Sequence, residues 1–337
     1  MKALVCQTPG ELALVERPDP YPLAGEVLVR IRRVGICGTD YHIYEGSHPF
    51  LAYPRVMGHE LAAEVVDAPR GSALKSGELV IVNPYIACGE CVACRKGQPN
   101  CCMRIAVLGV HRDGGMSDYL SIPERNLYPA GDLTADEAAS VEFLAIGAHG
   151  VGRAGNIEGA RTLIVGAGPI GIGAVIFAGL AGGRVTVMDR DPARLADAAR
   201  VTGVISWILA DAHAAAAVAE ATGGDGFDVV IDATGNRASI DAGFGYVAHT
   251  GHYVLLSVVR ENVTFADSEF HKREMTLFAS RNALKADFER VVAAIRARRI
   301  PMDKLLTHRT TLAGAVTDLP RWAHDKSGLI KALIEVS

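Results

Sequence analysis

Four cysteines in one short stretch constrain the fold of this chain more than any other feature. Residues 88–102 read CGECVACRKGQPNCC. The spacing C-x2-C-x2-C-x7-C is given by Cys88, Cys91, Cys94 and Cys102. Four thiolates this close, with glycine and proline that let the chain wrap, are typical of a structural zinc site with only cysteine ligands. The metal then replaces a hydrophobic core that a loop of this composition cannot build. The spacing favours Cys102 over its neighbour Cys101 as the fourth ligand.

A disulfide framework is the alternative interpretation of these cysteines. It is disfavoured because a small secreted chain spreads its cysteines, whereas here only Cys6 and Cys37 lie outside the cluster. The first residues, MKALVC, run directly into a strand-like alternation instead of a signal peptide. Free thiols without a signal peptide predict a reducing, cytoplasmic environment.

Length and charge limit the class of protein. At 337 residues the chain exceeds one ordinary core and predicts two domains. The formal net charge of −4 gives no electrostatic reason to expect nucleic acid or an anionic membrane as a partner. The uncharged stretch Thr162–Gly183 is long enough to span a bilayer, but it contains seven glycines and a proline. A buried strand, turn and helix therefore explain it better than a membrane span.

The first half of the sequence reads as short strands separated by turns. Apolar and polar residues alternate in Glu26–Val34 and in Gly58–Asp67, and Glu78–Asn83 is a short apolar run. This pattern predicts an all-β domain, a partly open barrel that carries the cysteine loop as an excursion.

After about residue 145, glycine- and alanine-rich helical stretches alternate with buried strands, which predicts a parallel, doubly wound sheet. The predicted strands are Arg161–Val165, Val185–Asp189, Asp228–Asp232 and Gly251–Ser257. Near the end, Ala286–Arg299 reads as an amphipathic helix. Leu329–Val336 alternates apolar and polar residues again, as expected for a strand that returns to the first domain.

The first of these strands is followed by the pattern G-x-G-x-x-G. Its residues are Gly166, Ala167, Gly168, Pro169, Ile170 and Gly171. Alone the pattern is weak, and a glycine-rich turn that binds nothing is the alternative. A strand before it, a helix after it and an acid at the end of the next strand make it a dinucleotide-binding fingerprint. Its glycines permit the tight turn and the close approach of backbone to pyrophosphate, which faces the helix N-terminus.

The acid at the end of the second strand, Asp189, favours NAD over NADP. Its carboxylate can accept hydrogen bonds from the adenosine ribose and would repel a 2′-phosphate. Arg190 and Arg194 are nearby cations that can attract such a phosphate, which keeps NADP as the less favoured alternative. If no such phosphate binds, Arg190 faces solvent or lies over the adenine of the cofactor.

A second group of potential metal ligands lies in the β-rich half, in the segments GICGTDYH (35–42) and GHE (58–60) and at Glu142. A catalytic zinc needs about three protein ligands and one open position. Cys37 and His59 are the natural pair, with Glu142 or Glu60 as the third ligand. Each residue alone is more often structural, but their occurrence together with the cysteine loop and the fingerprint predicts a catalytic zinc.

Together these motifs resemble the zinc-dependent medium-chain dehydrogenases/reductases of the alcohol and sorbitol dehydrogenase type. The likeness covers essentially the whole chain, with GICGTDYH, GHE, the cysteine loop, VEFLAIGAH, VGAGPIG, VMDRDPARL and SRN in the family's order. It implies a GroES-like β-barrel catalytic domain over residues 1–145 that holds both zinc ions. It further implies a Rossmann NAD-binding domain over residues 146–285 and a return over residues 286–337 that completes the first domain. A homo-tetramer is expected, with a dimer as the alternative.

The resemblance also assigns roles to residues around the catalytic zinc. Cys37, His59 and Glu142 would surround the metal, and Glu60 would be an exchangeable ligand. Asp40 would orient His59. Thr39 and His42 would carry the proton from the substrate oxygen to solvent. The family's cofactor contacts fall on Ser257, Val258, Arg281 and Asn282.

The run FHKREMTLFASRN resembles the branch that acts on sugar acids, such as the 5-dehydrogenases of L-gulonate, L-galactonate or L-idonate. Arg281 can hold a substrate carboxylate in a bidentate pair; alternatively it contacts the cofactor or pairs within the fold. Phe143 and Ile43 depart from the sorbitol dehydrogenase pattern, which argues against sorbitol itself.

Three hypotheses of function follow. The first is a zinc- and NAD-dependent dehydrogenase for a secondary hydroxyl of a sugar acid or polyol. The second is a threonine-type amino-alcohol dehydrogenase, which shares every motif above. The third is a cofactor-binding protein without redox chemistry, like the lens crystallins of this superfamily, which lose the zinc ligands that are retained here.

Overall fold

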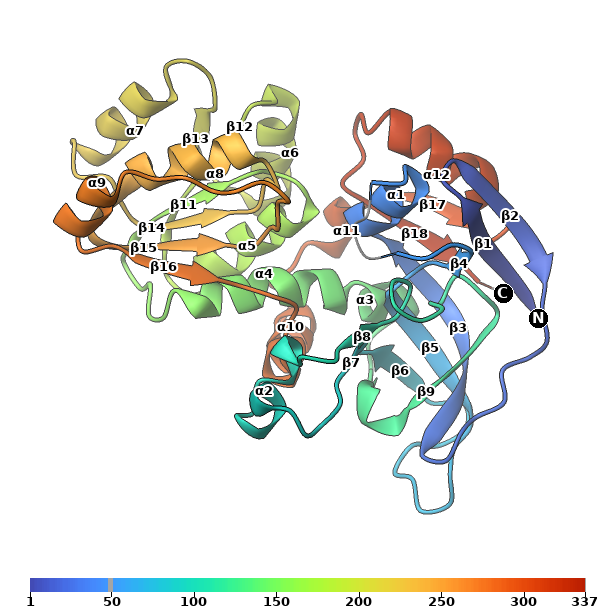
Figure 1. Cartoon of the computed structure of the whole chain (residues 1–337). Coiled ribbons are helices and arrows are strands. Elements are labelled where there is room, and N and C mark those ends of the chain that lie inside the picture. The colour runs from blue at the N-terminus through green and yellow to red at the C-terminus, as the bar shows by residue number, and fades with distance from the viewer. Residues whose placement is uncertain (48–50, 337) are drawn as a thin grey trace. The chain divides into compact units, whose positions relative to one another are not determined.

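The computed structural model describes residues 1–47 and 51–336, and it divides into two compact units (Figure 1). The first unit, called unit 1, comprises Met1–Glu142 and Val292–Ser337, and unit 2 is the uninterrupted stretch Phe143–Val291. Two helices carry the boundaries, α4 (Val141–Arg153) and α10 (Lys285–Arg296). One unit is therefore assembled from both ends of the chain, and the other from a single continuous segment.

Unit 1 is built mainly from β-strands, as the sequence predicts. Its strands are β1 (Lys2–Thr8), β2 (Glu11–Glu16), β3 (Glu26–Ile36), β4 (Arg55–Val56), β5 (Glu60–Asp67), β6 (Leu79–Val82), β7 (Tyr85–Ile86), β8 (Ala106–Val107), β9 (Tyr119–Pro123), β10 (Leu127–Pro129), β17 (Leu306–Thr311) and β18 (Lys331–Glu335). Its short helices are α1 (Gly38–Tyr44), α2 (Val92–Arg95), η1 (Pro99–Cys101), η2 (Glu124–Asn126), α3 (Ala135–Ala139), α11 (Met302–Leu305) and α12 (Ala315–His324). The largest sheet runs β10-β6-β5-β3-β18-β17, and β9 also pairs with β3.

Strand β18 pairs with two strands of unit 1, and its burial differs from the expected alternation. It lies between β3, with which it is antiparallel, and β17, with which it is parallel (Figure 1). Lys331, Ala332, Leu333 and Ile334 are all buried, because the strand is central and covered on both faces. Lys331, the one charged residue among these four, is 1% exposed.

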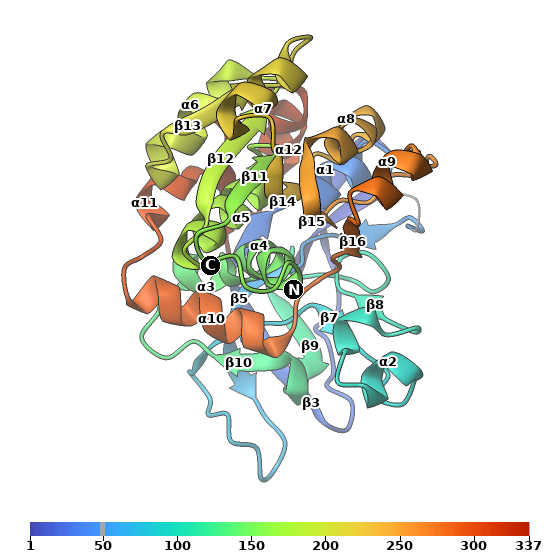
Figure 2. The same ribbon diagram turned by 90° about the vertical axis from the view of Figure 1, so that its left-hand side faces the viewer.

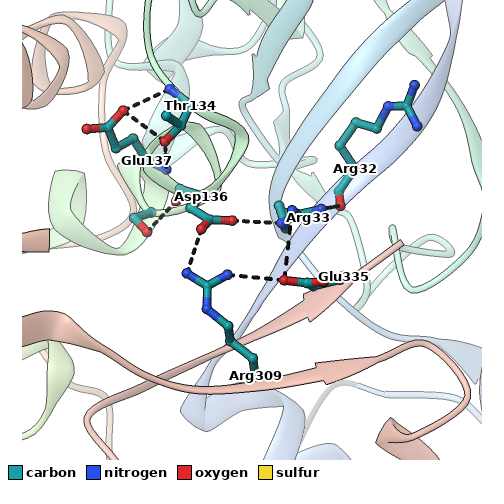
Figure 3. A network of polar contacts seen from close by, with 8 residues as sticks. Arg32, Arg33, Thr134, Asp136, Glu137, Arg309 and Glu335 are labelled. Carbon is teal, nitrogen blue, oxygen red and sulfur yellow. Dashed lines mark hydrogen bonds and ion pairs between the residues drawn. The ribbon is translucent and has the colours of Figure 1, made fainter. Parts of the chain in front are cut away.

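A network of ion pairs joins α3 to three strands of this sheet (Figure 3). Asp136 accepts hydrogen bonds from Arg33 Nε at 2.7 Å and from Arg309 Nη2 at 2.6 Å. Arg309 Nη1 also donates to Glu335 at 3.2 Å. Burial alone would raise the pKa of Asp136, but the hydrogen bonds from the two arginines outweigh it and hold that pKa below its ordinary value. The network therefore links β3 near the start of the chain to β18 near its end.

Unit 2 contains the predicted parallel, doubly wound sheet, which is confirmed. Its strands are β11 (Arg161–Val165), β12 (Arg184–Asp189), β13 (Ser206–Leu209), β14 (Phe227–Asp232), β15 (Val247–Leu255) and β16 (Thr276–Ala279). Its helices are α5 (Pro169–Leu180), α6 (Pro192–Thr202), α7 (Ala214–Thr222), α8 (Arg237–Gly243), η3 (Phe244–Tyr246) and α9 (Asp267–Lys272). The strand order is β13-β12-β11-β14-β15-β16, with all neighbours parallel. The order reverses direction between β11 and β14, where open α/β sheets bind ligands.

Two strands of this sheet, β13 and β16, were not predicted from the sequence. Each has four residues and lies at an edge, so its side chains are not buried on both faces. Trp207 in β13 is 57% exposed and Leu277 in β16 is 39% exposed. The uncharged stretch Thr162–Gly183 forms most of β11, a turn and α5, and no helix among the described residues is long and apolar enough to cross a membrane.

Candidate functional site

The four-cysteine loop is an excursion of unit 1 that is closed at its base by a two-stranded ladder. Tyr85 pairs with Val107 and Ile86 with Ala106, so residues 87–105 leave and return through one neck. Both views show β7, β8 and α2 next to one another (Figures 1 and 2). The β7–β8 ladder therefore fixes where the loop leaves unit 1, although neither strand belongs to the main sheet.

The loop gathers the four predicted thiols into one cluster. The Sγ–Sγ distances are 3.4 Å for Cys102–Cys88, 3.5 Å for Cys91–Cys94, 3.9 Å for Cys91–Cys102 and 4.0 Å for Cys88–Cys94. A tetrahedron of thiolates with zinc–sulfur bonds of about 2.3 Å has edges of about 3.8 Å, so these sulfurs fit a zinc ion. None of the cysteines is disulfide-bonded, and Cys101 is exposed, outside the cluster.

Backbone amides donate hydrogen bonds to the sulfur atoms of Cys102 and Cys91 in this cluster. The N–H groups of Cys88 and Arg104 donate to Cys102 Sγ at 3.3 and 3.4 Å, and that of Met103 donates to Cys91 Sγ at 3.4 Å. Hydrogen bonds from the backbone of Glu90 and Cys91 lower the pKa of Cys88 to about 6. Thiolates stabilised in this way are ready metal ligands.

A second cluster brings together Cys37, His59 and Glu60, whose ligand atoms all lie within 4.8 Å of one another. Cys37 follows the last residue of β3 and is the N-cap of α1, while His59 immediately precedes β5 and Glu60 is its first residue. Gly35 is the direct antiparallel partner of Glu60. A Cβ on Gly35 would lie 2.0 Å from Glu60 Oε2, so the glycine leaves the space that the carboxylate occupies.

Asp40 joins the two segments that carry this cluster. Its Oδ2 accepts a hydrogen bond from Cys37 N at 2.8 Å, and its Oδ1 accepts one from Gly58 N at 3.2 Å. His59 Nδ1 is buried without a hydrogen-bond partner among the described residues. In this structure Asp40 therefore fixes the backbone on either side of the cluster, and we find no hydrogen bond from it to that imidazole nitrogen.

Glu60 is held by a lysine from the far end of the chain. Lys331 Nζ forms an ion pair with the Glu60 carboxylate and donates to the Ile36 carbonyl at 2.9 Å. Both side chains are completely buried. Glu60 Oε2 accepts no hydrogen bond within the described part of the chain, although it lies within ion-pair distance of the ammonium group. One carboxylate oxygen thus retains capacity for a further cation.

Glu142 lies beside this cluster but has a different partner. It stands in the first turn of α4, is 4% exposed, and its Oε1 accepts a hydrogen bond from the Tyr85 hydroxyl. Burial raises the pKa of Glu142 to about 7. Burial also raises the pKa of Tyr85 well above its ordinary value, so the phenol stays protonated and donates.

The electrostatic environment of the second cluster favours a bound cation. Burial would lower the pKa of His59, yet Cys37 and the carboxylates of Asp40 and Glu142 raise it well above its ordinary value. A group of sulfur, nitrogen and oxygen donors, in which His59 Nδ1 and Glu60 Oε2 are buried without a hydrogen bond in the described part of the chain, fits zinc. Cys37, His59 and Glu60 are the residues that would hold it in this arrangement, with Glu142 adjacent.

The two residues of the expected proton path lie on α1. Thr39 Oγ1 is 3.8 Å from Cys37 Sγ, which places the hydroxyl at the second cluster. His42 is exposed and lies in the last turn of the helix. Both residues thus lie on one short helix of unit 1, Thr39 near the second cluster and His42 at the surface.

The glycine fingerprint of unit 2 has the geometry that a phosphate site requires. Gly166 has a φ of +98°, and a Cβ on Gly171 would lie 1.7 Å from the Gly166 carbonyl oxygen, so both positions require glycine. Gly168 is the N-cap of α5. The only heavy atom near its Cβ position among the described residues is Arg194 Nη1 at 4.0 Å, which leaves room for a pyrophosphate.

Asp189 stands at the end of β12, where the sequence predicts the ribose-binding acid. Its Oδ2 accepts a hydrogen bond from Ala167 N at 2.7 Å, inside the fingerprint, and its Oδ1 accepts one from Asp191 N at 2.9 Å. Arg190 and Arg194 are exposed. The acid therefore also braces the glycine turn, a contact that the spacing alone does not reveal.

The remaining predicted contacts follow two neighbouring strands of the same sheet. Ser257 and Val258 follow β15, and a Cβ on Gly235 would lie 3.7 Å from Ser257 Cβ. Arg281 and Asn282 follow β16, and Asn282 has a φ of +53°. Carboxyl ends of parallel strands share one edge, so these residues lie on the side where the fingerprint turn begins.

Sequence reasoning missed two residues that contact the candidate ligands, Lys331 and Tyr85. A signal existed for the lysine, because a charged residue inside LIKALI is unusual in an apolar strand and implies a buried partner. For Tyr85 there was none, since its contact with Glu142 joins positions 57 residues apart.

The fold and the two clusters define a class of protein. Residues 23–132 match the family described as alcohol dehydrogenase GroES-like domain, and residues 169–297 match the one described as zinc-binding dehydrogenase. The chain belongs to this family of zinc-type, medium-chain alcohol dehydrogenases. It is accordingly an oxidoreductase that uses zinc and a nicotinamide cofactor.

The chain is also similar to particular proteins. L-galactonate-5-dehydrogenase of Escherichia coli K12 is 41% identical over 338 residues, which cover 99% of this chain and 98% of that protein. An L-threonine 3-dehydrogenase of Bacillus velezensis is 33% identical over 74% of each chain. Among solved structures, the alcohol dehydrogenase RspB of Escherichia coli CFT073, complexed with NADH, matches with a TM-score of 0.93 at 30% identity and covers 99% of both chains.

Proposed function

We propose that this protein oxidises a secondary hydroxyl group of a sugar acid, of the L-galactonate type, to a ketone with NAD as the acceptor. The observation that carries the proposal is the buried cluster of Cys37, His59 and Glu60 in unit 1. Its thiol, imidazole and carboxylate are the ligand types of catalytic zinc sites. The choice of substrate class is supported by the 41% identity to L-galactonate-5-dehydrogenase. Unit 1 acts as the catalytic domain and unit 2 as the cofactor domain.

Zinc bound at the second cluster supplies a Lewis acid that lowers the pKa of a substrate hydroxyl. The nicotinamide supplies the acceptor for the hydride that leaves the same carbon. The chain's own residues do the rest. Cys37, His59 and a carboxylate hold the metal, Asp40 fixes the backbone around them, and Thr39 accepts the hydroxyl proton. His42 passes that proton to solvent, so the alcohol loses one hydride and one proton and becomes a ketone.

Arg281 is the residue that we propose to recognise the substrate carboxylate. It is exposed and follows β16 at the edge of unit 2 where the fingerprint turn begins. A guanidinium group binds a carboxylate through two parallel hydrogen bonds, whereas a neutral polyol offers no such partner. Contact with the cofactor is the alternative role for this arginine.

A panel of substrates tests the proposal. NADH formation is measured with aldonic acids, neutral polyols and L-threonine, for the wild type and for Arg281→Ala and Arg281→Lys. We expect turnover of an aldonic acid, a KM raised about 10- to 100-fold in Arg281→Ala and a smaller change in Arg281→Lys. Turnover of neutral polyols alone would assign Arg281 to the cofactor. Turnover of L-threonine alone would favour the amino-alcohol reaction, which the B. velezensis relative performs by its name.

The preference for NAD rests on Asp189, whose carboxylate disfavours a 2′-phosphate. We further propose a homo-tetramer. We also propose that it works in the cytoplasm, in keeping with cysteines that form no disulfide bond in the described structure. Light scattering on the eluting protein distinguishes a tetramer from a dimer.

A further inference from the structure

Tyr85 occupies a position that touches both metal-binding regions of unit 1. It is the first residue of β7, only three positions before Cys88, and it closes the neck of the cysteine loop opposite Val107. Its hydroxyl reaches Glu142, the acid beside the second cluster. The side chain is 6% exposed, so it is enclosed by protein and not by solvent.

The backbone of Tyr85 is anchored on both sides. Its N–H donates to Asn83 Oδ1 at 3.0 Å, and its carbonyl accepts from Asn126 Nδ2 at 3.2 Å. Asn126 Nδ2 also donates to the Asn83 carbonyl at 2.8 Å, and the Asn83 N–H donates to the Asn126 carbonyl at 2.7 Å. Asn126 is itself buried. The main chain of Tyr85 is therefore fixed, and its ring is buried, unlike that of a surface tyrosine.

Glu142 depends on this hydroxyl for its orientation. The tyrosine hydroxyl engages Oε1 of this carboxylate. The carboxylate is close enough to His59 and Glu60 to interact electrostatically with both. Outer hydrogen-bond partners that fix a ligand in this manner set the affinity of metal sites.

We propose that Tyr85 is a positioning residue that holds the carboxylate of Glu142 at the metal site formed by Cys37 and His59. The proposal rests on the proposed function in one respect, the presence of zinc at that site. It goes further because it gives Tyr85, at the base of the cysteine loop, a direct hydrogen bond to the acid beside the catalytic metal.

The test is the zinc affinity of the second site in Tyr85→Phe, which removes the hydroxyl and keeps the ring. Zinc per chain is measured by mass spectrometry in buffers of graded free zinc, and the visible spectrum is recorded after replacement of zinc by Co²⁺. Tyr119→Phe is the matched control, because it removes another hydroxyl of unit 1, hydrogen-bonded to Arg30 Nη2 at 2.9 Å. We expect the second zinc to bind about 10- to 100-fold more weakly in Tyr85→Phe, with shifted cobalt bands, and both to stay unchanged in Tyr119→Phe.

A double-mutant cycle with Glu142→Gln shows whether Tyr85 acts through that acid. The two substitutions together should weaken binding no more than Glu142→Gln alone, because the hydroxyl then has no carboxylate to hold. Additive effects, or an unchanged zinc affinity in Tyr85→Phe, would overturn the proposal. A wild type that binds one zinc only, or a second zinc that survives Cys37→Ser, would instead count against the proposed function.

Discussion

The ammonium group of Lys331 and the carboxylate of Glu60 form an ion pair whose two side chains are 1% and 0% exposed. Removal of one partner leaves an uncompensated buried charge. We therefore expect Lys331→Met to lower the free energy of unfolding by about 3–5 kcal/mol in urea titrations. Lys326→Met, which removes an exposed ammonium group over the Tyr41 ring, should lower it by about 1 kcal/mol or less. The double variant Lys331→Met/Glu60→Gln should regain most of the loss; no recovery would mean that the pair is not the source.

Gly35 should be indispensable for the second zinc. In Gly35→Ala the new methyl group would occupy the position of Glu60 Oε2, which Lys331 prevents from moving freely. We expect zinc per chain to fall from two to one, with the cysteine loop still loaded. Gly38→Ala is the control, since its Cβ would meet nothing within 4 Å. Two zinc ions in Gly35→Ala would show that the carboxylate can relocate and still bind.

The cysteine loop should stabilise the protein through its metal. Cys94→Ser opens the four-thiolate cluster, so we expect one zinc fewer per chain and a melting temperature lower by several degrees. Cys101→Ser, which changes an exposed thiol next to the cluster, should alter neither. An unchanged melting temperature and zinc content in Cys94→Ser would show that the metal binds elsewhere.

Asp189→Ala should weaken the binding of NADH and reduce the preference of the protein for NADH over NADPH. The loss has two sources, the acceptor for the ribose hydroxyls and the hydrogen bond that braces Ala167. Dissociation constants from nicotinamide fluorescence measure both cofactors in parallel. Asp197→Ala, on α6, is a control for loss of a negative charge from the same unit. If both affinities fall by the same factor, Asp189 braces the turn but does not select the cofactor.

Zinc binding at the second site should strengthen as the pH rises through about 7. Burial raises the pKa of Glu142 from its ordinary 4.5 to about 7 in the metal-free protein. The neutral acid therefore stabilises the metal-free fold below about pH 4.5, and this contribution is lost as the pH rises through 7. Binding of zinc needs the ionised form. In Glu142→Gln the zinc affinity measured between pH 6 and 8 should depend less steeply on pH, and an identical slope would exclude Glu142 as the titrating group.

Much of the fold was predictable because its signals are local. The fingerprint between Gly166 and Gly171 is contiguous, and the thiols from Cys88 to Cys102 span fifteen residues, so spacing alone predicts their clustering. The buried strands of unit 2 were also predictable from their apolar runs. The edge strands β13 and β16 were not, because four residues, mostly exposed, give no periodic pattern.

What spacing does not provide is contact between distant residues. The partners Lys331 and Glu60 are 271 positions apart, and Tyr85 and Glu142 are 57 apart, so no window of sequence contains either pair. The role of Asp40 differs for a similar reason. Its oxygens turn to the amides of Cys37 and Gly58, a choice that depends on the three-dimensional approach of the two segments.

The place of β18 in the sheet has a consequence for the order in which the protein is made. The strand lies between β3 and β17, so the central sheet of unit 1 cannot close until the ribosome has delivered Lys331–Glu335. Unit 2 is one continuous segment and can fold earlier during synthesis. Until then the buried carboxylate of Glu60 has no ion-pair partner. A chain that stops before Lys331 lacks a central strand of the sheet and the ammonium group that pairs with Glu60. Completion of translation is thus also completion of the site.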